Sequence, residues 1–125
     1  MILGVGIDLV EHCRVERELA AGKWAETDGV FTREEITYCS AGVWPARRYA
    51  AFFAAKEATL KALGLAVPDT GIYRDIEVFA RTGDQHEIVL HNRAQAEFMN
   101  RGGRHIRLSV GSTREQAGAM VIVEA

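Results

Sequence analysis

The fold of this chain depends most on one stretch of its sequence, Phe52-Phe53-Ala54-Ala55-Lys56-Glu57-Ala58-Thr59-Leu60-Lys61-Ala62-Leu63-Gly64. Ala, Leu, Lys and Glu fill its interior and favour an α-helix, and Gly64 is typical of the residue that ends one. The stretch therefore predicts most of a long helix, which we expect to run from about Ala46 to Leu63.

Polar residues of this helix lie on or beside its apolar side. At about 100° per residue, Phe53, Glu57 and Leu60 fall on nearly the same line, and Lys61 follows one turn later on the same side. A carboxylate in such surroundings is costly unless something pairs with it. Glu57 and Lys61 therefore indicate a site for a metal ion and a phosphate.

An apolar run opens the chain, Ile2-Leu3-Gly4-Val5-Gly6-Ile7-Asp8-Leu9-Val10. It is rich in β-branched residues and too short to span a membrane, so we expect a buried strand over residues 2–7. Asp8 interrupts the run and has two interpretations. It caps a helix that starts near Val10, a role that suits Asp, or it joins Glu57 as a ligand of a hard cation such as Mg²⁺.

Composition limits the class of protein. With 125 residues, we expect one domain, residues 1–125, with a core of its own. The net charge of −2 suggests neither nucleic acid nor a membrane as a partner. Cys13 and Cys39 form neither a metal-binding spacing nor a disulfide framework, and no signal peptide is visible, so we expect a cytoplasmic protein. The histidines share no ligand spacing and are expected at the surface or at helix caps: His12, His86, His91 and His105.

The rest of the sequence alternates between helical and strand patterns. Helices are expected over residues 10–21, 33–39 and 92–100, the second opened by the capping-box pattern Thr32-Arg33-Glu34-Glu35 and the third capped by Asn92. Strands are expected over residues 73–80, 86–90, 104–110 and 117–123, with turns at 68–71 and 82–84. Because the late strands follow one another closely, we expect antiparallel hairpins. The pattern is α+β, with a small antiparallel or mixed sheet packed on the long helix.

These residues resemble the holo-acyl-carrier-protein synthases, which are small phosphopantetheinyl transferases. The resemblance spans nearly the whole chain, and the order and spacing of its blocks make it specific. Three blocks carry it: Gly6-Ile7-Asp8-Leu9-Val10-Glu11 with Arg14, Phe31-Thr32-Arg33-Glu34-Glu35-Ile36-Thr37-Tyr38-Cys39, and Phe53-Ala54-Ala55-Lys56-Glu57-Ala58 followed by Lys61-Ala62-Leu63-Gly64.

The resemblance implies a 4′-phosphopantetheinyl transferase-like fold and an activity. Family members move phosphopantetheine from coenzyme A to a serine of apo-acyl carrier protein and release 3′,5′-ADP. Asp8 and Glu57 match the family's Mg²⁺ ligands, and Lys61 matches a lysine near the coenzyme A phosphates, so these three are the expected catalytic residues. Either Glu57 or a metal-bound water takes the serine proton.

The resemblance also implies binding residues and an assembly. Gly64 ends the long helix where the nucleotide passes, and Arg14 matches a contact to the acidic carrier protein. Arg17 and Trp24 extend this expected docking face, although without the family a solvated helix face is the better explanation of the two arginines. The family enzymes are homotrimers with sites between subunits, which predicts a homotrimer whose coenzyme A cleft is shared.

The chain departs from the family on the coenzyme A side. Phe52 stands where the family has Arg, and Gly83-Asp84-Gln85 differs at a hairpin. Ser109-Val110-Gly111-Ser112-Thr113 replaces Ser-x-Ser-His-Thr, so the family His is lost. We still expect coenzyme A contacts from the polar residues of this strand and from two arginines that can reach a 3′-phosphate in place of Phe52. These residues are Ser109, Ser112, Thr113, Arg47 and Arg48.

Two functions therefore stay open. The first is an active transferase with an altered coenzyme A cleft. Losing a cationic contact to phosphate costs about 1.5–3 kcal/mol, which slows turnover without abolishing it. The second is a degenerate or repurposed member that binds an acyl carrier protein, or its tethered acyl chain, without transfer. Retention of Asp8, Glu57 and Lys61 favours the first function, and the apolar Phe52 suits the second.

Overall fold

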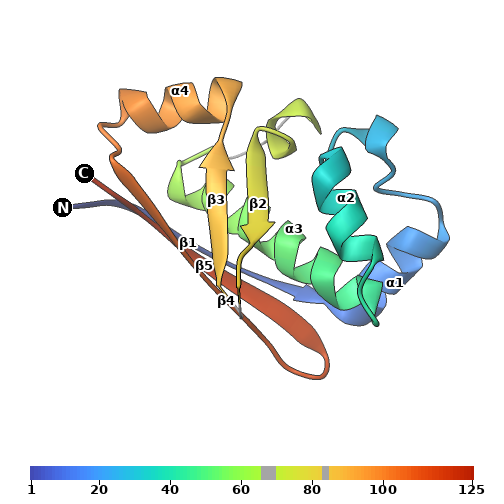
Figure 1. Ribbon diagram of the computed structural model, residues 1–125. Coiled ribbons are helices and arrows are strands. Elements are labelled where there is room, and N and C mark those ends of the chain that lie inside the picture. The colour runs from blue at the N-terminus through green and yellow to red at the C-terminus, as the bar shows by residue number, and fades with distance from the viewer. Residues whose placement is uncertain (66–69, 83–84) are drawn as a thin grey trace.

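Strands from the two ends of the chain form one antiparallel sheet (Figure 1). The computed structural model describes residues 1–65, 70–82 and 85–125. In these residues β1 (Ile2–Glu11) pairs with β5 (Gln116–Glu124), which also pairs with β4 (His105–Ser112), in the order β1-β5-β4. Figure 1 shows the two termini side by side at one end of this sheet.

The long helix α3 (Pro45–Ala62) packs on the inner face of this sheet and supplies much of the core. The helix lies close to β1 because β1 carries glycine at the contact. A Cβ at Gly6 would collide with the Ala58 carbonyl, and one at Gly4 would collide with the Ala62 carbonyl. This close packing places the Asp8 region of β1 beside the last turns of α3.

A second, two-stranded sheet completes the fold. β2 (Ile76–Ala80) and β3 (His86–Leu90) form an antiparallel pair, and α3 contacts β2 as well as the first sheet. The other helices are α1 (His12–Ala20), α2 (Arg33–Ser40) and α4 (Asn92–Asn100), with short 3₁₀ turns η1 (Glu26–Asp28) and η2 (Thr70–Tyr73). The predicted α+β class and the antiparallel pairing of the late strands are confirmed.

The N-terminal strand differs from the prediction in length and burial. It continues to Glu11, so Asp8 lies inside β1 opposite Ala119 and caps no helix. Gly6 and Val10 are buried, but Val5, Ile7 and Leu9 alternate with them and are more than half exposed, at 53, 60 and 60%. The strand is therefore buried on one face, because α3 covers only that face.

Two further boundaries differ for local reasons. Asn92 is not the cap of α4: it has a positive φ of 45° as the first helical residue, and His91 precedes the helix as N-cap. The strand expected from residue 73 begins at Ile76, since Thr70–Tyr73 forms a 3₁₀ turn. Of the turns expected at 68–71 and 82–84, residues 68–69 and 83–84 lie outside the described residues.

Two residues expected near the surface are buried instead. His12 is 1% exposed, and its Nδ1 lies 3.2 Å from the Arg114 carbonyl oxygen. Trp24 stacks on Phe53 with ring centroids 4.9 Å apart and is 9% exposed, so it belongs to the core and not to a docking face.

Among the helices of the described residues, none is both long and apolar enough to cross a membrane. Cys13 and Cys39 are free thiols, the first exposed and the second buried.

Candidate active site

Asp8 and Lys61 meet where β1 packs on α3. The Lys61 Nζ donates to Asp8 Oδ1 at 3.1 Å and to the Ile7 carbonyl at 2.9 Å. The Lys61 side chain is 53% exposed and that of Asp8 is 19% exposed. An ion pair this open contributes at most about 1 kcal/mol to stability. The ion pair matters more for geometry than for stability, because it fixes one oxygen of Asp8 and holds the Lys61 ammonium at the surface.

Glu57 lies one turn before Lys61 and is held by a tyrosine. The Tyr73 hydroxyl donates to Glu57 Oε1 at 2.7 Å. The pKa of Tyr73 is raised well above its usual range, first by burial, then by the hydrogen bond to Glu57 and by the charges of Glu57 and Asp8, while Arg14 opposes the shift. Both carboxylates and the Arg14 guanidinium therefore act on the same hydroxyl, and the structure brings together the expected trio of Asp8, Glu57 and Lys61.

Each of the two carboxylates keeps one oxygen available. Within the described residues, Asp8 Oδ2 and Glu57 Oε2 accept no hydrogen bond from the protein, whereas Oδ1 and Oε1 do. The part of the chain that the structure describes contains no cluster of three or more metal-ligating side chains. Two carboxylates with free oxygens suit Mg²⁺, which takes one or two protein carboxylates and completes its shell with water and substrate phosphate.

The expected carrier-binding arginines lie on α1. Arg14 is exposed, and its Cζ lies 5.8 Å from the centroid of the Phe53 ring. Arg17 is exposed one turn later on the same helix. Arg14 therefore stands beside the acidic pair, and Arg17 extends positive charge along α1.

A groove of about 710 Å³ opens at the other end of α3. Its lining includes Tyr38, Trp44, Arg47, Arg48, Phe52 and Ser112. Arg47 donates from Nε and Nη2 to Ser112 Oγ at 3.1 and 2.9 Å. Phe52 is 1% exposed and stacks on Tyr38 with centroids 5.4 Å apart. Phe52 and Ser112, which stand where the family has Arg and His, thus line one groove that also contains Arg47.

Arg48 is bound differently from Arg47. It donates to the Tyr38 carbonyl at 2.7 Å, and its Cζ lies 4.1 Å from the centroid of the Tyr38 ring. This cation–π contact ties Arg48 to α2. Arg47 is therefore held through a side-chain hydroxyl, whereas Arg48 is held through a backbone carbonyl and an aromatic ring.

Ser109 and Thr113 do not line this groove in the subunit. Side chains alternate along β4, so Ser109 lies on the outer face of the sheet, opposite Met120. The Thr113 hydroxyl accepts from the backbone N–H groups of Glu115 and Gln116 at 3.3 and 3.2 Å and so closes the β4–β5 hairpin. Any contact of these two with coenzyme A stays a prediction.

Gly64 follows α3 in the left-handed region, with a φ of +69°. The Leu65 N–H donates to the Leu60 carbonyl at 2.9 Å and the Gly64 N–H to the Lys61 carbonyl at 3.0 Å, which is a Schellman motif. A Cβ at Gly64 would lie 2.7 Å from Arg101 Nη2. The predicted end of α3 at Gly64 is confirmed, and the Arg101 guanidinium packs against this glycine.

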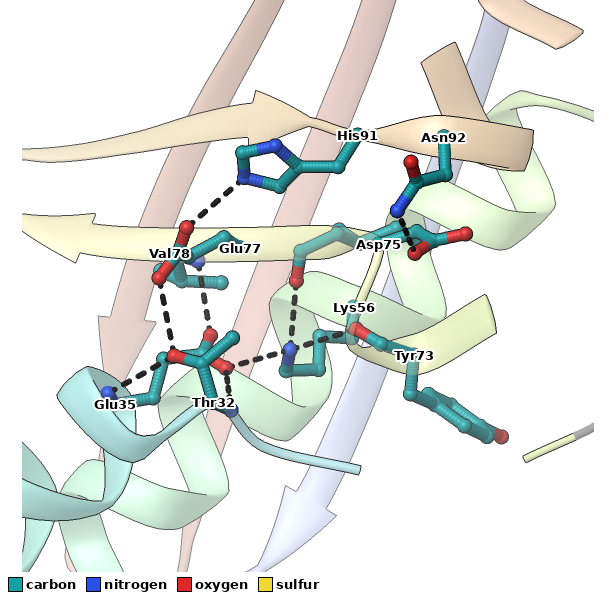
Figure 2. A network of polar contacts seen from close by, with 10 residues as sticks. Thr32, Glu35, Lys56, Tyr73, Asp75, Glu77, Val78, His91 and Asn92 are labelled. Atoms are coloured by element: carbon teal, nitrogen blue, oxygen red, sulfur yellow. Dashed lines mark hydrogen bonds and ion pairs between the residues drawn. The ribbon is translucent and has the colours of Figure 1, made fainter. Parts of the chain in front are cut away.

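A buried ion pair that the sequence pattern did not predict links α3 to α2 (Figure 2). Lys56 Nζ donates to Glu35 Oε1 at 2.9 Å, and both side chains are at most 1% exposed. Glu35 is also the capping-box residue of α2, accepting from the Thr32 N–H at 2.8 Å. Lys56 lies one turn from both Phe52 and Leu60, so the helical periodicity that places Glu57 beside apolar residues does the same for Lys56.

The comparisons with known proteins assign the family. The chain belongs to the 4′-phosphopantetheinyl transferase superfamily, whose family model matches residues 4–116. Curated relatives are named holo-[acyl-carrier-protein] synthase. That of Geobacter sp. (strain M21) is 40% identical over 124 residues, covering 99% of both chains, and that of Koribacter versatilis (strain Ellin345) is 37% identical and covers the same share of each. The family predicted from the sequence is confirmed.

Solved structures agree with the fold. The holo-[acyl-carrier-protein] synthase of Neisseria meningitidis matches over 100% of both chains with a TM-score of 0.85 and 26% identity. That of Bacillus anthracis, solved in complex with CoA (3′,5′-ADP), covers 100% of this chain and 98% of its own, with a TM-score of 0.78 and 27% identity.

Proposed function

We propose that this chain transfers 4′-phosphopantetheine from coenzyme A to a serine of an apo-acyl carrier protein and releases 3′,5′-ADP. The observation that carries this conclusion is the meeting of Asp8, Glu57 and Lys61 in a full-length relative of curated synthases. Of the two functions left open by the sequence, transfer agrees with the names of these relatives. The acceptor serine belongs to the carrier, so the site needs no nucleophile of its own.

Asp8 and Glu57 are the proposed ligands of Mg²⁺. When bound, the ion neutralises the pyrophosphate and the charge on the departing nucleotide. Lys61 adds a half-exposed ammonium beside the pair and can exchange its bond to Asp8 for one to a phosphate oxygen. The protein thus supplies fixed charges of both signs where negative charge develops.

The groove at Arg47 is the proposed place for the 3′-phosphate end of coenzyme A. Arg47 brings a guanidinium to the position where Phe52 and Ser112 replace a family Arg and His. Ser112 holds that guanidinium through a hydroxyl, which a phosphate can replace as the stronger acceptor. In this proposal Arg47 compensates for the two lost groups.

Arg14 and Arg17 are the proposed contacts to the acidic carrier protein, since Arg14 stands beside the acidic pair to which the carrier serine must come. The proposed assembly is a homotrimer, supported by the exposed apolar side chains on the outer face of the β1-β5-β4 sheet. The organisation of residues 1–125 as one domain and the cytoplasmic location stay predictions.

The test is the intact mass of an apo-acyl carrier protein incubated with the enzyme, coenzyme A and Mg²⁺. The native protein should add the mass of phosphopantetheine, and chelation of the metal should stop the addition. Asp8→Asn and Glu57→Gln should each slow it about a hundredfold or more, since each removes a ligand charge. Glu34→Gln, an exposed carboxylate on α2, serves as the control and should retain the native rate. No mass gain with the native protein across several carriers would refute the proposal.

A further inference from the structure

The carbonyl of Tyr73 is part of the buried polar network in Figure 2. Lys56 Nζ has three acceptors: Glu35 Oε1 at 2.9 Å, the Tyr73 carbonyl at 2.8 Å and the Ile76 carbonyl at 2.6 Å. The second oxygen of Glu35 accepts from the Val78 N–H at 2.9 Å. Because an ammonium has three N–H donors, Lys56 is fully satisfied and fixes the chain from η2 into β2.

Figure 2 shows the side chain of Tyr73 pointing away from this network. Its hydroxyl reaches Glu57 in the candidate active site. Its ring stacks on Phe53 with centroids 5.7 Å apart, and its hydroxyl donates to Glu57 at 2.7 Å. Lys56 and Glu57 are neighbours on α3. The helix therefore binds the backbone of Tyr73 through one residue and its hydroxyl through the next.

We propose that Tyr73 is a positioning residue that holds Glu57 Oε1, so that the other oxygen, Oε2, stays available and oriented for the divalent cation. This inference rests on the proposed function of Asp8 and Glu57 as cation ligands. Partners that orient a ligating carboxylate typically change metal affinity by about 10–100-fold when removed.

The test measures metal binding directly and apart from turnover. Free Mn²⁺ is titrated into the protein with coenzyme A present and carrier absent, and unbound Mn²⁺ is read from its EPR signal against a coenzyme A blank. Tyr73→Phe should weaken Mn²⁺ binding about tenfold. Tyr49→Phe is the matched control, because it removes a hydroxyl that bonds Ser40 at 2.8 Å elsewhere in the fold. The control should bind Mn²⁺ as the native protein does.

A turnover assay separates positioning from general loosening of the fold. Raising Mg²⁺ about tenfold should restore most of the kcat of Tyr73→Phe, which a destabilised fold would not allow. Native Mn²⁺ affinity in Tyr73→Phe, an equal loss in Tyr49→Phe, or a defect that Mg²⁺ does not relieve would each overturn the inference. Mn²⁺ binding by the native protein that Asp8→Asn leaves unchanged would instead refute the metal site itself, and this inference with it.

Discussion

Lys56 and Lys61 are ammonium groups on the same helix with opposite surroundings. Lys56 is fully buried, and burial lowers its pKa while the Glu35 carboxylate opposes the shift. Removing Glu35 would leave an uncompensated charge, which typically costs about 3–5 kcal/mol. Lys61 is half exposed and bound to Asp8, so it can change partners at low cost. Lys56 therefore stabilises the fold, and the exposure of Lys61 suits its proposed contact with the coenzyme A phosphates.

Arg47 is the side chain that we expect to bind the 3′-phosphate of coenzyme A. Arg47→Ala should raise the KM for coenzyme A about tenfold or more, because a charged contact to phosphate is worth about 1.5–3 kcal/mol. The kcat should change less, since Arg47 lies at the other end of α3 from Lys61. Initial rates at varied coenzyme A concentrations give both constants. Arg33→Ala, which removes an exposed pair with Glu26 at 3.2 Å, is the control. An unchanged KM would show that the 3′-phosphate binds elsewhere.

At the scale of elements, the site depends on how closely α3 approaches β1. Gly6 faces the Ala58 carbonyl and Gly4 faces the Ala62 carbonyl without room for a Cβ. Glu57 precedes Ala58, and Lys61 precedes Ala62. The glycines that allow the packing thus also set the separation between Asp8 on the strand and its partners on the helix.

Gly6→Ala should therefore reduce stability and activity together. The added methyl must push α3 away from β1, and overpacking of this kind costs typically about 1–3 kcal/mol. Urea denaturation measures the loss of stability, and the carrier mass assay measures activity at a concentration of enzyme that remains folded. Gly111→Ala provides a stability control, since a Cβ there meets nothing within 4 Å. A Gly6→Ala protein with native stability and rate would contradict the packing argument.

At the scale of the whole molecule, the outer face of the main sheet lacks a cover within the described residues. Ile7 and Leu9 are each 60% exposed and Met120 is 42% exposed, all on the face opposite α3. An apolar sheet face of this kind is typical of an interface between subunits. The proposed homotrimer would bury it.

Leu9→Glu should convert a homotrimer into monomers, because burying an unpaired charge in an apolar interface is strongly unfavourable. Light scattering coupled to size-exclusion chromatography measures the mass. Met99→Glu, at a 62% exposed position on α4, is the matched control and should leave the assembly intact. Carrier modification by Leu9→Glu should fall with the loss of trimer if the coenzyme A cleft is shared. A native protein that is monomeric at assay concentration would refute the proposed assembly.

Local interactions explain what could be predicted from the sequence. The helix expected over residues 46–63 is observed as Pro45–Ala62, the strand expected over 86–90 is His86–Leu90, and the Thr32–Glu35 capping box forms. Periodicity, capping and the glycine stop each depend on residues within one or two turns of each other. For Asp8 the apolar run indicates only that the carboxylate needs a partner, so a helix cap and a shared cation with Glu57 both stay open on the residues alone, and the resemblance to the family favours the second.

The main elements and the family thus follow from residue order and local pattern alone, and the sequence also nominates Asp8 and Glu57 as site residues, an assignment that stays a prediction. Which of two neighbouring charges is buried depends on long-range packing, because Lys56 and Glu57 are adjacent in sequence but face different elements. The tertiary structure also decided that Asp8 extends a strand, that Tyr73 reaches Glu57, and that the outer face of β1 is exposed. Burial and long-range hydrogen bonds depend on what packs opposite a residue, and a residue's neighbours in sequence do not specify its neighbours in space.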